Sequence, residues 1–129
     1  MNPVSDLSKQ PKILVVDDDE SIRELISLAL EDDGLDVISA PEGESALQMI
    51  PEIKPDLILL DTRMPVMDGR EFARRYRELD DVSAALVILT AVDDPERTAA
   101  DLGADGYLAK PFDLTDLTET VNRFLQSRR

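Results

Sequence analysis

Short apolar runs alternate with amphipathic segments along most of this chain. The runs predict strands, and they span residues 12–16, 35–39, 56–60, 85–89 and 106–109. Because strict alternation of apolar and polar residues is missing from them, both faces of each strand are expected to be buried. Strands of this kind are typical of a parallel sheet that is covered by helices on both sides.

Between and after these runs, apolar residues recur at helical spacing. Helices are predicted from Glu20 up to an end signal at Gly34 and over residues 43–50, 70–79, 95–103 and 113–125. Pro51 is expected to stop the second helix, and Asp113 to cap the last one. The residues at helical spacing in the first helix are Ile22, Leu25, Ile26 and Ala29, and one face of the third helix carries Phe72, Ala73, Tyr76 and Leu79. The predicted buried stripe of the last helix is formed by Leu114, Leu117, Val121, Phe124 and Leu125.

The order of these elements predicts one α/β domain, a three-layer α/β/α sandwich around a five-stranded parallel sheet. Residues 12–127 form the expected domain, and 129 residues suit a single core. Residues 1–11 are polar, contain two prolines and are expected to form a flexible N-terminal tail.

Composition narrows the range of possible functions. The formal net charge of −14 argues against a nucleic-acid backbone or an anionic membrane as a direct partner and favours a metal cation or a basic protein surface. The chain has no cysteine, which excludes disulfides, thiol catalysis and zinc thiolate sites. It also has no histidine, which is the commonest acid–base catalyst and the commonest transition-metal ligand. A metal would therefore be hard and bound by oxygen. With no secretory signal and no long apolar run, a cytoplasmic location is expected.

Several polar residues directly follow the predicted strands. Asp17 and Asp18 follow the first strand, Asp61 the third, and Thr90 and Lys110 the last two. Parallel strands end at one edge of a sheet, and ligands of open α/β sheets bind there. Three carboxylates close together repel one another, so either some of them are protonated or a cation lies among them, and Mg²⁺ is the natural candidate for that cation. Carboxylate, divalent cation, ammonium and hydroxyl together can neutralise a phosphoryl group during its transfer.

The motifs "ILVVDDDE", "LILLDTRMPVMDG", "VILTA" and "GYLAKPF" stand in this order at the ends of strands. Together they resemble the receiver domains of bacterial response regulators, the CheY-like family, over roughly residues 12 to 127. The resemblance implies a flavodoxin-like sheet with the strand order 2-1-3-4-5. It further implies a phosphorylation switch in a two-component phosphorelay, which catalyses only its own phosphorylation and dephosphorylation.

The same resemblance assigns roles to single residues. Asp61 would accept the phosphoryl group, and Asp17, Asp18, Asp61 and the backbone carbonyl of Arg63 would hold Mg²⁺. Lys110 would pair with the phosphoryl oxygens, Thr90 would bond the phosphoryl group, and Tyr107 would turn inward with it. A cis peptide bond is implied before Pro111.

The partners follow from the same reasoning. Without histidine, the chain needs an external phosphoryl donor, which is a sensor histidine kinase, a histidine phosphotransfer protein or a small phosphodonor. The resemblance further implies output through a protein-binding face made by the fourth helix, the fifth strand and the fifth helix, around residues 95 to 125. A homodimer formed on phosphorylation belongs to the same set of expectations.

Blander interpretations exist beside this one. An acid at a strand end is often a helix cap, and Asp19 is assigned that role and left out of the metal site. The arginines at positions 74, 75 and 77 are expected to form a solvated helix face beside Glu71 and Glu78. "VVDDDES" also resembles the haloacid-dehalogenase-type phosphohydrolases, with Asp17 as nucleophile and Asp19 as acid–base. A third alternative is an interaction module that has lost phosphorylation, against which the intact set of acids, Thr90 and Lys110 argues.

Overall fold

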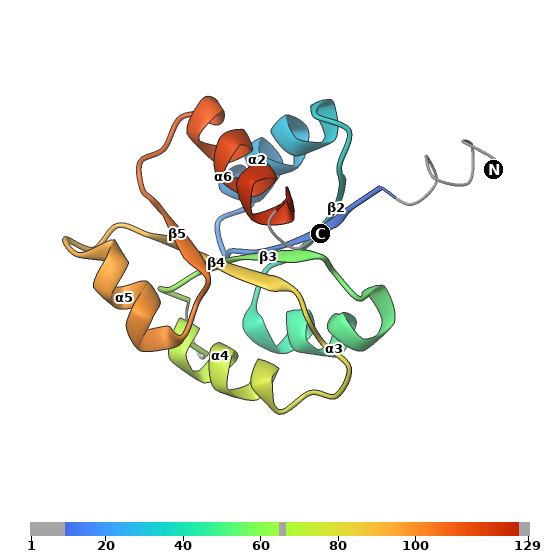
Figure 1. Ribbon diagram of the computed structural model, residues 1–129, viewed down its shortest axis with the longest axis vertical. Helices are drawn as coiled ribbons and strands as arrows, with labels where there is room; N and C mark the ends of the chain where they lie inside the picture. The colour runs from blue at the N-terminus through green and yellow to red at the C-terminus, as the bar shows by residue number, and fades with distance from the viewer. Residues whose placement is uncertain (1–9, 65–66, 127–129) are drawn as a thin grey trace.

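The computed structural model describes residues 10–64 and 67–126, and within these ranges five strands alternate with five helices (Figure 1). Most of the predicted tail, residues 1–9, and residue 127 at the end of the predicted domain lie outside the described residues. The strands are β1 (Lys12–Val16), β2 (Asp36–Ala40), β3 (Leu57–Asp61), β4 (Ala85–Thr90) and β5 (Gly106–Ala109). The helices are α2 (Glu20–Asp32), α3 (Gly43–Ile53), α4 (Gly69–Arg77), α5 (Pro95–Leu102) and α6 (Leu114–Gln126).

All four strand pairings are parallel, and the strand order is β2-β1-β3-β4-β5. Helices α2 and α6 cover one face of the sheet, and α3, α4 and α5 cover the other (Figure 1). The three-layer fold and the strand order implied by the resemblance are thereby confirmed. Because the order reverses beside β1, the chain leaves β1 and β3 toward opposite faces, which opens a crevice at their carboxyl ends.

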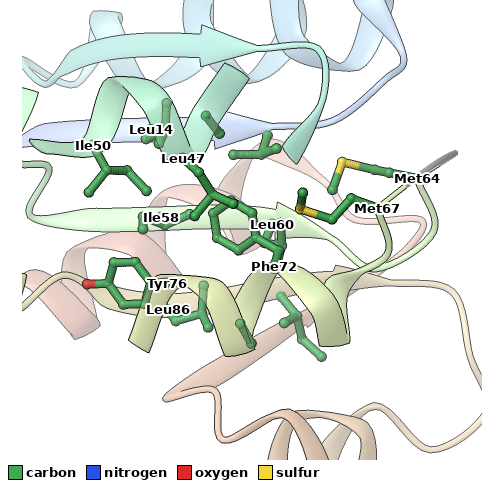
Figure 2. Packing of buried hydrophobic residues seen from close by; sticks show 14 of the residues in the cluster. Leu14, Leu47, Ile50, Ile58, Leu60, Met64, Met67, Phe72, Tyr76 and Leu86 are labelled. Carbon is green, nitrogen blue, oxygen red and sulfur yellow. The ribbon is translucent and has the colours of Figure 1, made fainter. Parts of the chain in front are cut away.

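Each face of the sheet has its own apolar core, as the unbroken apolar runs predict. In β1, Ile13 and Val15 pack toward α2 and α6, whereas Leu14 and Val16 pack toward α3 and α4. In Figure 2, the side chains of Phe72 and Tyr76 from α4 lie against residues of β3 such as Leu60, and Met64 and Met67 stand at one end of this cluster. The two cores fix the sheet rigidly between its helical layers.

Two local signals in the sequence are confirmed. The Asp19 carboxylate accepts hydrogen bonds from the backbone N–H groups of Ser21 and Ile22, so Asp19 caps α2. The Asp113 carboxylate accepts a bond of 2.7 Å from the backbone N–H of Asp116 and caps α6. Both contacts join residues at most three positions apart, and such contacts follow directly from a local pattern.

Other expectations were wrong. The second helix, α3, continues through Pro51 to Ile53. Pro51 lies in the last turn, where its missing N–H removes a single helical bond, and Ile53 still packs against the core. Leu114, assigned to the buried stripe of the last helix, is 45% exposed.

The predicted solvated arginine face is confirmed for Arg74 and Arg77, which are exposed, whereas Arg75 is half-buried. Arg74 forms exposed ion pairs with Glu71 and Glu78 within α4, as expected. Arg75 instead reaches across to Glu44 on α3, 2.6 Å away, and Arg77 donates to the backbone carbonyl of Leu102 at the end of α5. These two arginines therefore join α4 to its neighbouring helices.

Candidate functional site

Three carboxylates gather at the carboxyl ends of β1 and β3. Val16 is paired with Leu60 in the parallel register, so the residues that follow them, Asp17 and Asp61, lie side by side. One oxygen from each of Asp17, Asp18 and Asp61 lies within 4.8 Å of the others. Asp17 is completely buried, Asp61 is 6% exposed and Asp18 is exposed. The predicted acidic cluster is present, with its open side at Asp18.

Short hydrogen bonds hold the loop between β1 and α2. The backbone N–H of Asp19 donates to Oδ1 of Asp17 over 2.9 Å. The Asp19 carboxylate accepts hydrogen bonds from backbone N–H groups in the first turn of α2. Arg23, one turn further along α2, reaches back and donates from Nη1 to the backbone carbonyl of Asp17 over 2.8 Å. Sequence reasoning missed Arg23, although its place one turn beyond the capping residue is where a long side chain can return to the loop.

Lys110 supplies the cation of the site. Its Nζ lies 3.2 Å from Oδ2 of Asp17 and 3.5 Å from Oδ1 of Asp61. From the end of β5, the side chain of Lys110 thus reaches past β4 to both carboxylates and lies nearer to Asp17. The backbone N–H of Lys110 bonds the carbonyl of Thr90, and the Lys110–Pro111 peptide bond is cis, as the resemblance implied.

The environment of Asp61 opposes its negative charge. Burial is the main cause that raises the pKa of Asp61, and the charge of Asp17 adds to the rise. The backbone N–H of Arg63, which donates to Oδ1 over 3.2 Å, and the Lys110 ammonium both act to lower the pKa. Because the net direction is upward, a further cation at the three carboxylates would relieve an unfavourable concentration of charge.

Thr90 and Tyr107 occupy different parts of this edge. Thr90 is buried at the end of β4, where its hydroxyl accepts a bond of 3.3 Å from the backbone N–H of Val92. Tyr107 on β5 is 37% exposed and lines a cavity of about 480 Å³ between α5, β5 and α6. The structure therefore brings Lys110 into contact with Asp17 and Asp61, with Asp18 within 4.8 Å of the other two carboxylates, Thr90 at the same edge and Tyr107 farther out.

The loop after Asp61 is closed by a glycine. Gly69 donates to the carbonyl of Thr62 over 3.3 Å, and a Cβ atom on Gly69 would lie 3.2 Å from the Thr62 Cα atom. A side chain would press into the backbone beside Asp61, so this close approach favours glycine. Pro65, which belongs to the motif "LILLDTRMPVMDG", lies outside the described residues.

Comparison with known proteins gives matches over the same region. The model of the family described as response regulator receiver domain matches residues 13–122. The alkaline phosphatase synthesis transcriptional regulatory protein PhoP of Bacillus subtilis is 41% identical over 117 residues, which are 89% of this chain and 48% of that protein. The chain thus spans about half the length of the curated relatives it matches.

Solved structures agree with the fold. Chemotaxis protein CheY4 of Vibrio cholerae matches with a TM-score of 0.77 and 34% identity, over 89% of this chain and 98% of CheY4. The receiver domain of sensor histidine kinase PA1611 from Pseudomonas aeruginosa matches with a TM-score of 0.82 and 28% identity, over 91% of this chain and 98% of that domain. The PA1611 domain was crystallised with a magnesium ion coordinated in its active-site cleft.

Proposed function

Because the chain belongs to the response regulator receiver domain family, and is thus a phosphoacceptor signalling module of two-component systems, we propose that Asp61 accepts its phosphoryl group. The observation that carries this proposal is the position of the Asp61 carboxylate, which is nearly buried and faces both the acidic pair and Lys110. Residues 12–127 are proposed as the domain, and a cytoplasmic location remains part of the proposal.

The three carboxylates fit Mg²⁺. They offer only oxygen, they lie within 4.8 Å of one another, and they carry more negative charge than Lys110 alone neutralises. Asp17, Asp18 and Asp61 would hold the ion, together with the backbone carbonyl of Arg63. When bound, Mg²⁺ supplies charge neutralisation for the phosphoryl oxygens and orients them. The magnesium ion in the PA1611 receiver supports this assignment.

The residues of the chain divide the chemical step between them. An Asp61 carboxylate oxygen forms a bond to phosphorus while the bond from phosphorus to the donor atom breaks, and the electron pair of that bond returns to the donor atom. This atom is a nitrogen in a phosphohistidine or an amido phosphate and an oxygen in an acyl phosphate. Lys110 stands where its ammonium can leave Oδ1 of Asp61 and pair with a phosphoryl oxygen. Thr90 offers a neutral hydroxyl donor to the same group. Hydrolysis by water then restores the Asp61 carboxylate and releases phosphate.

The phosphoryl donor is proposed to dock beside Lys110. Receiver domains interact with histidine kinases, and this chain has no histidine of its own. Next to Lys110, the side chains of Ile22, Leu25, Pro111 and Phe112 line an apolar cavity of about 360 Å³. Leu25 is 46% exposed, and with its neighbours it forms an apolar surface beside Lys110 that suits a histidine kinase or a histidine phosphotransfer protein.

Output is proposed to use a different face. Helix α5, strand β5 and helix α6 surround the cavity that Tyr107 lines, and a downstream protein would bind there. Homodimer formation on phosphorylation would use the same face. Both partners remain proposals, since the chain spans about half of its curated relatives.

The phosphohydrolase alternative was wrong. The family match covers residues 13–122 and describes a phosphoacceptor module rather than an enzyme that turns over a metabolite. The acid–base role suggested for Asp19 also conflicts with its contacts, because its carboxylate caps α2.

A mass measurement tests the acceptor. With Mg²⁺ and a small acyl or amido phosphate donor, wild type should gain one phosphoryl group, and Asp61→Asn should gain none. Asp68→Asn is the matched control, because it removes an equal charge near the same loop and asparagine caps α4 as well as aspartate does. Equal phosphorylation of wild type and Asp61→Asn would refute the assignment.

A further inference from the structure

Each polar group of Asp17 has a partner. Its N–H donates to the carbonyl of Ala40 over 3.3 Å, Oδ1 accepts from the N–H of Asp19, and Oδ2 lies beside Lys110 Nζ. Its backbone carbonyl accepts from Nη1 of Arg23. Ala40 belongs to the sheet, Asp19 belongs to the turn, and Lys110 takes part in the proposed phosphoryl chemistry. Arg23 is the remaining partner and has none of these roles.

Arg23 closes a ring of hydrogen bonds through the first turn of α2. The backbone N–H of Arg23 donates to the carbonyl of Asp19 over 3.0 Å, and the N–H of Asp19 donates to the Asp17 carboxylate over 2.9 Å. The guanidinium then returns to the Asp17 carbonyl, only six residues back along the chain. The loop that carries Asp18 is therefore tied to the helix on both sides.

The bond from Arg23 acts on the orientation of Asp18. A peptide unit is planar, so a fixed carbonyl at Asp17 also fixes the N–H and the Cα direction of Asp18. Asp18 is exposed, whereas Asp17 and Asp61 are held by burial. Of the three carboxylates, Asp18 thus depends most on its backbone for its position.

The contact that Arg23 makes also keeps Asp18 available. Asp18, Asp19 and Glu20 all stand within five residues of Arg23, and arginine pairs readily with carboxylates. Yet none of the ion pairs among residues 10–64 and 67–126 involves Arg23, which uses its guanidinium on a carbonyl instead. An ion pair from Arg23 to Asp18 would occupy the carboxylate that a metal needs.

We propose that Arg23 is a positioning residue of the metal site, which orients the Asp17–Asp18 peptide so that the Asp18 carboxylate points at the ion. This inference rests on the proposed Mg²⁺ site and adds a residue to it. Removal of a residue that orients a metal ligand without touching the metal commonly weakens metal binding by about 10- to 100-fold.

The opposite sign is expected if Arg23 acts through its charge alone. A cation near a Mg²⁺ site repels the ion, so removal of that charge would tighten Mg²⁺ binding. Loss of positioning would weaken binding. The direction of the change in dissociation constant therefore separates the two roles.

The experiment is a Mg²⁺ titration followed by amide NMR, with phosphorylation rates from a small phosphodonor measured in parallel. Arg23→Ala should raise the dissociation constant for Mg²⁺ by about tenfold. The Mg²⁺ concentration that gives half the maximal rate should rise equally, while the rate at saturating Mg²⁺ stays near that of wild type. A merely structural role would lower stability without this split.

Arg74→Ala is the matched control. Arg74 is also a helical arginine, and its ion pairs are exposed and confined to α4, so its removal changes the net charge equally. Its Mg²⁺ affinity should match that of wild type. Arg23→Gln, with a shorter and uncharged side chain, tests again whether the dissociation constant for Mg²⁺ rises or falls. It separates the two roles of Arg23 if Arg23→Ala does not fold.

The possible results separate this inference from the proposed function. Weaker Mg²⁺ binding in the Arg23 variants, with Arg74→Ala unchanged, supports the positioning role. Equal or tighter binding in the Arg23 variants overturns the role and leaves the metal site intact. A wild-type protein that does not bind Mg²⁺ overturns the metal site, and the inference falls with it.

Discussion

At the scale of single residues, Asp61 combines two demands that conflict. A nucleophile must be ionised, yet burial and the charge of Asp17 raise the pKa of Asp61. Lys110 and the N–H of Arg63 offset part of this effect. The folded state without metal therefore binds a proton at Asp61 more readily than the unfolded state does, which ties stability to pH.

Asp61→Asn should stabilise the metal-free protein near neutral pH. A carboxyl whose pKa is raised by folding favours the folded state below its unfolded pKa, and this contribution is lost as pH rises through the folded pKa. The gain in free energy of unfolding should be roughly 1 kcal/mol, the usual size of a point-mutation effect, and should shrink in acid. Urea unfolding with a chelator at acid and neutral pH measures it. A gain of the same size at both pH values would contradict this origin.

At the scale of elements, the register of β4 and β5 relates the phosphoryl site to the outer face. Ile88 is paired with Tyr107 and Thr90 with Ala109. Paired residues of parallel strands share a face, and side chains two positions apart point the same way. Thr90 and Tyr107 therefore lie on one face of the sheet, and the β5 residue paired with Thr90 is the small Ala109.

Thr90→Ala should separate phosphorylation from the response of Tyr107. A phosphoryl group at Asp61 adds strong acceptor oxygens, and movement of the Thr90 hydroxyl toward them would vacate space that the Tyr107 ring can fill. The variant should still accept phosphate, because Asp61 and Lys110 remain. Tyrosine-labelled NMR with a beryllofluoride mimic can follow the two tyrosines, Tyr76 and Tyr107. A Tyr107 resonance that shifts equally in wild type and Thr90→Ala would exclude this coupling.

At the scale of the whole molecule, the sheet order places acids from two distant segments in one crevice. Asp17 and Asp61 are neighbours because β1 and β3 pair at the point where the strand order reverses. The fold without metal must hold three carboxylates together, which opposes folding. An ion that binds there would stabilise the folded state by mass action.

Among the described residues, no helix has both the length and the apolar character needed to cross a membrane.

Mg²⁺ should raise the melting temperature of wild type, and the double variant Asp17→Asn/Asp18→Asn should lose this rise. At a concentration about 100-fold above the dissociation constant, the stabilisation should be about 2.7 kcal/mol. Thermal unfolding with and without Mg²⁺ measures it. The control is Asp80→Asn/Asp81→Asn, an adjacent exposed pair, of which Asp81 forms an exposed ion pair with Lys54. A full Mg²⁺ effect in the Asp17/Asp18 variant would place the metal elsewhere.

Much of this architecture could be predicted from the sequence because it depends on neighbours along the chain. The apolar runs predict all five strands, with β1 and β5 matching their predicted ranges and the other three within one residue of theirs. Asp19 and Asp113 cap their helices through contacts at most three residues long. The strand order came from the resemblance of four motifs to a known family, since composition and periodicity do not determine which strands pair.

Only the tertiary structure decided the contacts between residues that are far apart. Lys110 and Asp17 are 93 positions apart, and the packing of β5 around β4 sets the 3.2 Å between them. Leu25 is 46% exposed, although its helical spacing resembles that of the buried Ile26. A pattern along the chain records which side chains avoid water, because that preference belongs to each residue. The three-dimensional packing decides which of them find cover and which charges meet, because both depend on every element at once.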